Sequence, residues 1–151
     1  CLNHFIEGVN GAMNVSDIMT TTVVTVEMDD TLKVIREIFK NAKFHHVLVV
    51  QYDKLVGIIS DRDCLNALSP YLDTASENKR DVECLKRKAH QIMTREPVCI
   101  SKVTGIQYAM RVMMEHNVSC LPVIAPDEHI EGILSWRDLL RFFSEMKDEE
   151  A

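Results

Sequence analysis

Seven residues, Gly57-Ile58-Ile59-Ser60-Asp61-Arg62-Asp63, recur 75 positions later as Gly132-Ile133-Leu134-Ser135-Trp136-Arg137-Asp138. Five of the seven positions are identical in the two copies. Each copy reads as the end of an apolar strand, then a serine at a turn, then the first turn of a helix. We call these two stretches the first and the second turn.

The identity between the copies extends beyond the turns. Ile18-Met19-Thr20 matches Ile92-Met93-Thr94 at an offset of 74, and one extra residue near His129 then shifts the offset to 75. Self-similarity at a fixed spacing indicates an internal duplication. The sequence therefore predicts five segments: an N-terminal stretch 1–12, a first repeat 13–68, a charged linker 69–88, a second repeat 89–146 and a tail 147–151.

The first repeat predicts the order strand, helix, strand, strand, helix. A β-branched run favours a strand at 23–26, and Asp30 or Thr31 can cap the helix that follows. Two continuous apolar runs, 46–50 and 55–59, predict strands, the first of them buried on both faces. Ser60 then opens the second helix.

The second repeat predicts the same order. Strands are expected at 98–100, 121–124 and 130–134. The helix between the first two should begin with a capping box in which Thr104 pairs with Gln107. Ser135 opens the last helix.

The predicted fold class is α+β with an α/β-like arrangement, built from tandem β-α-β-β-α repeats. Each small sheet should bury one face against its own two helices. A half of roughly 55 residues has too little core to be stable alone. We therefore expect the halves to pack together about a pseudo-twofold axis, with clefts at their junction.

Composition excludes several classes of protein. The chain is 46% apolar and 26% charged, as in ordinary globular proteins, and its net charge of −6 argues against a nucleic-acid partner. No apolar run approaches the roughly 20 residues of a membrane span. The five cysteines, an odd number without a Cys-x-x-Cys pair, indicate a reducing, cytoplasmic setting. Residues 1–12 are interpreted as an extension or a cloning remnant, with Met13 as a plausible natural start.

The chemistry of the turns has two interpretations. Ser60 with Asp63, and Ser135 with Asp138, can be helix N-caps that need no ligand. Capping alone does not explain why an arginine stands in the first helical turn, against the helix dipole. Free N–H groups at a helix start beside an arginine suit a phosphate, and a neighbouring carboxylate can accept hydrogen bonds from a ribose diol. The pattern therefore suggests a small nucleotide site.

These turns resemble the end of a CBS motif, the repeat named for cystathionine β-synthase. The openings Asp17-Ile18-Met19-Thr20 and Gln91-Ile92-Met93-Thr94 resemble the same family, as does Val118-Ser119-Cys120-Leu121-Pro122-Val123. The resemblance covers roughly residues 15 to 143. It implies a paired module (a Bateman module) that dimerises into a disc and binds AMP, ADP, ATP, NAD or S-adenosylmethionine in its clefts.

The resemblance also implies roles for particular residues. The two aspartates, Asp63 and Asp138, would hold ribose hydroxyls. The phosphate would lie near Ser60, Arg62, Ser135 and Arg137. Backbone groups of Thr22, Val24, Pro97 and Val98 would frame the base, and the clefts would be lined by His45, His46, Ser119 and Cys120.

The two copies differ around these residues. His45 and His46 can gain positive charge near neutral pH, whereas Ser119 and Cys120 cannot. Asp61 places an extra negative charge where the second copy has Trp136, an aromatic that could stack on a base or pack internally. We therefore predict two clefts of unequal affinity.

The leading hypothesis is a regulatory module that senses an adenosine ligand, has no obligatory cofactor, is not an enzyme and acts on a separate, unknown protein. The alternative is a structural homodimerisation module whose clefts hold no ligand. A nucleotide hydrolase using Asp63 or Asp138 as a base ranks last, because no second carboxylate or metal cluster is indicated. The histidine pair has no further ligand at metal-binding spacing.

Overall fold

The structure is a computed structural model that describes the backbone of residues 13–150 and the side chains of residues 13–146. The interpretation of residues 1–12 lies outside this range. Within it, the chain forms two compact units. We call them the terminal unit (residues 13–23 and 98–150) and the central unit (24–97). No helix in the described part is long and apolar enough to cross a membrane.

The central unit contains a mixed four-stranded sheet in the order β1-β2-β3-β4. Its strands are β1 (Thr25–Glu27), β2 (His46–Gln51), β3 (Lys54–Ser60) and β4 (Thr94–Arg95). Strand β1 runs parallel to β2, and the other pairs are antiparallel. The predicted strand at 23–26 is thus present but shifted, and β2 is buried over 47–50 as its apolar run predicts.

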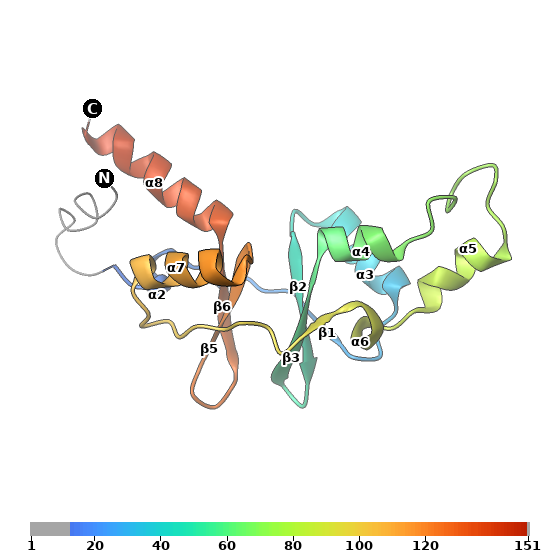
Figure 1. Cartoon of the computed structure of the whole chain (residues 1–151), viewed down its shortest axis with the longest axis horizontal. Helices are drawn as coiled ribbons and strands as arrows, with labels where there is room; N and C mark the ends of the chain where they lie inside the picture. Colours follow the sequence, from blue (N-terminus) through green and yellow to red (C-terminus); the bar gives the residue numbers. More distant parts are fainter. Residues whose placement is uncertain (1–12, 151) are drawn as a thin grey trace. The chain divides into compact units, whose positions relative to one another are not determined.

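Two helices of the central unit pack on one face of this sheet. They are α3 (Leu32–Asn41), capped by Thr31, and α4 (Asp61–Ala67), capped by Ser60. Leu32 and Ile35 from α3 and Cys64 from α4 share a core with the strands. Alternate strand residues face this core, namely Val47, Val49 and Ile59. Figure 1 shows α3 and α4 side by side.

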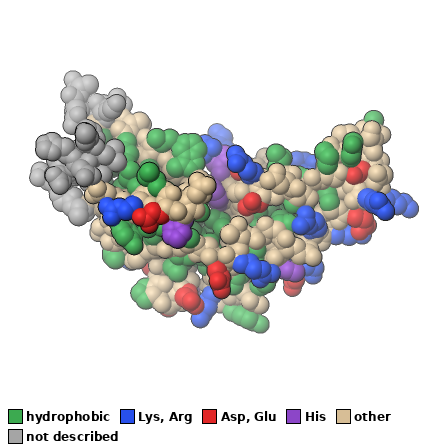
Figure 2. Space-filling model, in the orientation of Figure 1, with side chains coloured by type: hydrophobic (Ala, Val, Ile, Leu, Met, Phe, Trp, Pro, Cys, Tyr) green, Lys and Arg blue, Asp and Glu red, His purple; other side chains and the backbone are tan. Residues whose placement is uncertain are grey.

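The charged linker forms helical elements toward its C-terminal end. It contains α5 (Lys79–Glu83) and the short 3-10 helix η1 (Cys84–Lys86), and it leads into α6 (Ala89–Ile92). Asp81 is buried and accepts hydrogen bonds from Ser69 Oγ at 2.6 Å and Asn78 N at 2.8 Å. Arg36 in α3 pairs with Asp73 of the linker. Figure 2 shows acidic and basic side chains interspersed over this segment, as on an ordinary solvated surface.

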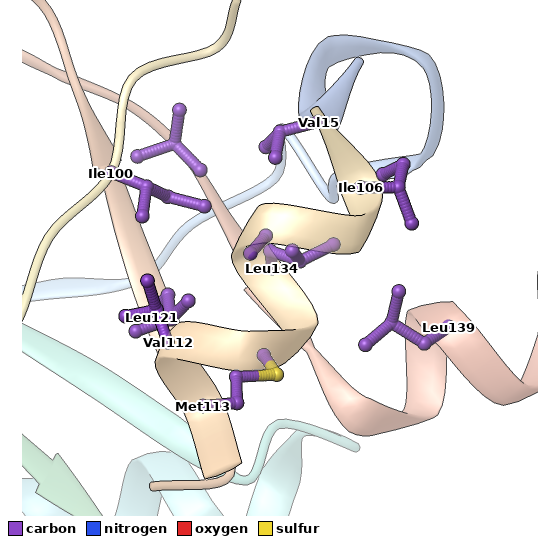
Figure 3. Close-up of a cluster of buried hydrophobic side chains, with 10 residues drawn as sticks. Val15, Ile100, Ile106, Val112, Met113, Leu121, Leu134 and Leu139 are labelled. Carbon is purple, nitrogen blue, oxygen red and sulfur yellow. The ribbon is translucent and has the colours of Figure 1, made fainter. Parts of the chain in front are cut away.

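The terminal unit repeats this plan with a shorter sheet. Its elements are α2 (Val15–Ile18), α7 (Ile106–His116), β5 (Cys120–Ile124), β6 (Ile130–Ser135) and α8 (Trp136–Glu150). Strands β5 and β6 pair antiparallel. Helices α2, α7 and α8 supply side chains that pack against Leu121 and Leu134 of the strands (Figure 3).

The predicted strand at 98–100 is wrong, because only one residue of this segment pairs. Ile100 bridges to Val123 in parallel. In the central unit Leu48 N donates to Val24 O at 3.0 Å. Pro122 replaces Leu48 in the second repeat and has no N–H, so the corresponding bond to Val98 cannot form. One proline thus shortens the edge of this sheet.

The predicted capping box at Thr104 is also wrong. Helix α7 begins at Ile106, with Gly105 as its N-cap. Thr104 lies one residue before this N-cap and belongs to a turn, in which its N–H donates to Ser101 O at 3.1 Å. The other predicted helix starts, at Thr31, Ser60 and Ser135, agree with the structure.

Each unit contains the opening segment of the other repeat. Thr20, from the first repeat, forms an antiparallel bridge with Ile133 of β6. Thr94, from the second repeat, pairs with Ile58 of β3. The compact units therefore differ from the sequence repeats by an exchange of these openings. As a result, each turn is flanked by residues that lie far away in the sequence.

Candidate functional site

Both turns form the predicted cap. In the first turn, Asp63 N donates to Ser60 Oγ at 3.0 Å and Ser60 N donates to Asp63 Oδ2 at 2.9 Å. In the second turn, the equivalent distances are 3.3 Å for Asp138 N to Ser135 Oγ and 2.8 Å for Ser135 N to Asp138 Oδ2. The capping interpretation is confirmed, and each serine and aspartate is held at the start of a helix.

The residue before β2 and the residue before β5 each accept a backbone hydrogen bond from one of the turns. Asp61 N donates to His45 O at 2.9 Å, and Trp136 N donates to Ser119 O at 3.1 Å. These bonds are at equivalent positions in the two repeats. They bring His45 next to the first turn and Ser119 next to the second turn, as the sequence predicts.

The two aspartates have very different surroundings. Asp138 is buried, with 5% of its surface exposed. Its Oδ1 accepts a hydrogen bond from Thr20 Oγ1 at 2.8 Å, and its Oδ2 accepts a second bond from the turn, from Ser135 Oγ at 3.0 Å. Arg141 Nη1 lies 3.8 Å from Oδ1. The carboxylate of Asp138 is therefore surrounded by donors of the protein itself.

Asp63 is more open. It is partly exposed, and among the described residues the donor to its carboxylate is the Ser60 N–H alone. Thr94, the counterpart of Thr20, is exposed and makes no hydrogen bond to Asp63 within the part of the chain that the structure describes. One carboxylate oxygen of Asp63 thus remains available to a ligand.

The glycine of each turn makes room for the exchanged opening segment. A Cβ atom on Gly132 would lie 2.7 Å from the carbonyl oxygen of Thr20, and one on Gly57 would lie 2.8 Å from Met93 Cγ. Both distances are too short for a real contact. The close approach that the glycines permit is therefore made by the chain itself.

The arginines and their neighbours also differ between the turns. His45 Nδ1 lies 2.9 Å from Asp61 Oδ2. Partial burial raises the pKa of Asp61, but the hydrogen bonds from His45 and from Arg62 N–H outweigh it and lower that pKa. In the second turn, the Arg137 guanidinium lies 5.0 Å from the centre of the Trp136 ring, a cation–π distance. Arg62 and Arg137 are both exposed, as a phosphate contact requires.

His46 and Cys120 occupy equivalent positions at the start of β2 and β5. His46 is partly buried, whereas Cys120 is buried. Burial and, to a lesser extent, the nearby Asp138 carboxylate together raise the pKa of the Cys120 thiol to about 12. Cys120 is therefore a neutral thiol at physiological pH, and it adds no positive charge beside the second turn.

The segments expected to frame a base are divided between the units. Thr22 lies in the terminal unit with Asp138, and Pro97 lies in the central unit with Asp63. Val24 and Val98 are partly buried and pack against the cores of the central and terminal units, respectively. No group of three or more His, Cys, Asp or Glu side chains that could hold a metal occurs in the described residues.

Sequence reasoning missed the role of Thr20. Its match with Thr94 was visible as part of the repeat, but the match gave no sign that only one of the two hydroxyls reaches a carboxylate. The relevant difference lies in how the exchanged segments approach each turn.

Comparison with known proteins identifies related chains. The sequence model of the CBS domain matches twice, over residues 15–70 and 89–145. A CBS domain-containing protein of Dictyostelium discoideum is 32% identical over 128 residues, which cover 83% of this chain and 88% of that protein. A homoserine O-acetyltransferase of Methanobrevibacter ruminantium is 30% identical over 122 residues, but the match spans only 22% of that enzyme.

Solved structures show the same fold. The CBS domain pair of protein MJ0100, in complex with 5′-methylthioadenosine and S-adenosylmethionine, has a TM-score of 0.74 and 22% identity. The match covers 90% of this chain and 99% of that one. CBSX2 in complex with AMP has a TM-score of 0.72 and 22% identity, with 89% and 98% coverage. At this level of identity the likeness concerns the fold.

Proposed function

The chain belongs to the CBS domain family, and on that premise we propose that it is a regulatory module that binds an adenosine-containing ligand and acts on a separate protein. The observation that carries the proposal is the repeated turn, which presents a carboxylate, a serine hydroxyl and an exposed arginine at a helix start. A carboxylate suits a ribose diol, and a helix start beside an arginine suits a phosphate.

The solved relatives support the ligand class. Their ligands are 5′-methylthioadenosine, S-adenosylmethionine and AMP, which share an adenosine moiety. In this chain the proposed contacts to ribose are Asp63 and Asp138. The proposed contacts to phosphate are Ser60, Arg62, Ser135 and Arg137. The module itself carries out no reaction, and its output is a change in contact with a partner protein.

We further propose that the module is a homodimer in the cytoplasm. Leu65 in α4 and Leu140 in α8 stand at equivalent positions of the two repeats and are 71% and 57% exposed. Large apolar side chains exposed at matching sites on helices favour a protein interface. Light scattering tests this proposal: we expect twice the mass of the chain, reduced to the mass of one chain by Leu65→Glu combined with Leu140→Glu.

Ligand binding is tested by thermal unfolding with a panel of AMP, ADP, ATP, NAD, S-adenosylmethionine and 5′-methylthioadenosine. A ligand at 100 times its dissociation constant stabilises the folded state by about 2.7 kcal/mol. At least one compound should raise the melting temperature, and guanosine analogues at equal concentration serve as controls. If every adenosine compound leaves the melting temperature unchanged, the proposal fails.

The second candidate is a structural dimerisation module without a ligand. It is favoured by one observation, namely that donors of the protein itself occupy both oxygens of the Asp138 carboxylate. This candidate predicts a stable dimer that none of the adenosine compounds stabilises.

A further inference from the structure

The carboxylate of Asp138 accepts a hydrogen bond from the hydroxyl of Thr20, a residue that is not among the proposed ligand contacts. Thr20 Oγ1 donates to Asp138 Oδ1 at 2.8 Å, while Oδ2 is occupied by the Ser135 N–H and hydroxyl. The side chain of Asp138 is 4% exposed. A carboxylate offers about four lone-pair directions. Three of them are therefore in use, and both oxygens are engaged.

From this geometry we propose that Thr20 is a latch that a ribose diol must displace before it can bind Asp138. The inference rests on the proposed function, because it concerns access of the same ligand class to one of its two carboxylates. A diol donates two hydrogen bonds, but the carboxylate of Asp138 has no two free acceptor directions while Thr20 is bound. The Asp63 carboxylate has no such competitor among the described residues.

The latch can open without unfolding the segment that carries it. Thr20 N donates to Ile133 O, and Ile133 N donates to Thr20 O, both at 2.9 Å. These two bonds hold the Thr20 backbone against β6, next to Gly132. Release of Asp138 therefore requires only a rotation about χ1 of Thr20, which moves the hydroxyl away from Oδ1.

The consequence is ordered loading. A ligand that binds Asp138 must first break the hydrogen bond from Thr20 to this charged acceptor, whereas a ligand that binds Asp63 breaks no such bond. The affinity of the Asp138 site is therefore lower by roughly tenfold to a hundredfold. At low ligand concentration the Asp63 site fills alone, and the Asp138 site fills only when the concentration rises further. The module thereby responds over a wider concentration range than two equal sites would allow.

The test is calorimetric titration of the full chain with AMP and with 5′-methylthioadenosine, two probes that carry the diol. The wild-type protein should bind in two steps. Thr20→Val keeps the shape of the side chain and removes the hydroxyl, so the weaker step should tighten roughly tenfold to a hundredfold. Thr20→Ser keeps a hydroxyl and should restore the wild-type value.

Thr94→Val is the matched control, because Thr94 is the counterpart of Thr20 and makes no hydrogen bond to Asp63 among the described residues. It should leave both steps unchanged. Thr20→Ala replaces Thr20→Val should the valine variant fail to fold. Circular dichroism verifies folding of each variant.

The outcomes separate the latch from the proposed function. If Thr20→Val leaves the weaker step unchanged or weakens it, the latch is wrong while ligand binding stands. If the wild type shows two equal steps, the latch is also wrong. If neither probe binds to the wild type or to Thr20→Val, the proposed function fails and the latch fails with it.

Discussion

The two turns of this chain share five of seven residues, yet their aspartates lie in different environments. Asp138 is buried and accepts hydrogen bonds from Thr20 and Ser135, whereas Asp63 is partly exposed and accepts one from Ser60. The difference originates in the opening segments that the repeats exchange. Near-identical motifs can thus differ in readiness for a ligand because of what packs beside them.

The largest effect that can test this comparison is thiol reactivity next to Asp138. Because the pKa of Cys120 is raised to about 12, its thiolate fraction at pH 8 is roughly a thousandfold below that of an ordinary cysteine. We expect iodoacetamide to modify Cys120 at least that much more slowly in the folded than in the urea-unfolded chain, as measured by peptide mass spectrometry. Rapid modification of Cys120 in the folded chain would show that the surroundings of Asp138 are open.

Removal of the two carboxylates should have unequal effects on stability. Asp138→Ala leaves three partly buried donor groups, the Thr20 hydroxyl and the Ser135 N–H and hydroxyl, without their acceptor. It should lower the free energy of unfolding by about 3 kcal/mol. Asp63→Ala removes one cap contact at a more exposed site and should cost about 1 kcal/mol. Urea denaturation of both variants measures the difference. Equal losses would contradict the contrast between a buried and an open carboxylate.

The two glycines should differ in what limits their replacement. Gly132→Ala forces a Cβ against the Thr20 carbonyl and should cost about 2 kcal/mol, because the backbone must move. Gly57→Ala meets the Met93 side chain, which is flexible, and should cost about 1 kcal/mol.

A double-mutant cycle provides the control for the glycines. Combining Gly57→Ala with Met93→Ala should cost less than the sum of the single variants, by about 0.5 kcal/mol or more. Strict additivity in denaturant unfolding would mean that Met93 does not limit the approach at Gly57.

The smallest expected effect on stability is that of Asp61, which lies between Ser60 and Arg62 in the first turn. The folded-state pKa of Asp61 is below its ordinary value of 3.8, so its contribution to stability is present above that value and lost as the pH falls through the folded pKa. Asp61→Asn should therefore be less stable than the wild type near pH 6, by about 0.5 kcal/mol for an exposed pair, and this difference should shrink as the pH falls below 3.8 and through the folded-state pKa of Asp61. Trp136→Phe, at the equivalent position, should differ from the wild type by an amount independent of pH.

Much of the fold follows from the sequence. The duplication, the apolar strands and the serine caps depend on local pattern, and the family assignment agrees with them. The prediction of a strand at 98–100 was wrong although the apolar pattern is present, because Pro122 in the neighbouring strand β5 has no N–H to pair with this segment. The predicted cap at Thr104 was wrong because Thr104 lies one residue before the helix cap and takes part in a turn with Ser101 instead.

The site was only partly predictable. The serines, the aspartates and the proximity of His45 and Ser119 to the turns follow from the repeat, because equivalent residues make equivalent backbone bonds. The difference between the two turns was predicted from His45, Asp61 and Trp136. Thr20 adds to this difference because it donates to Asp138, although it is the same residue type as its counterpart Thr94. Such a difference arises from tertiary packing, and one sequence compared with itself cannot reveal it.

The most direct measurement of the central claim is calorimetric titration of Asp63→Ala and Asp138→Ala with AMP and 5′-methylthioadenosine, beside the wild type. We expect two steps in the wild type, loss of the stronger step in Asp63→Ala and loss of the weaker step in Asp138→Ala. Loss of the stronger step in Asp138→Ala, or binding that neither substitution changes, would contradict the account.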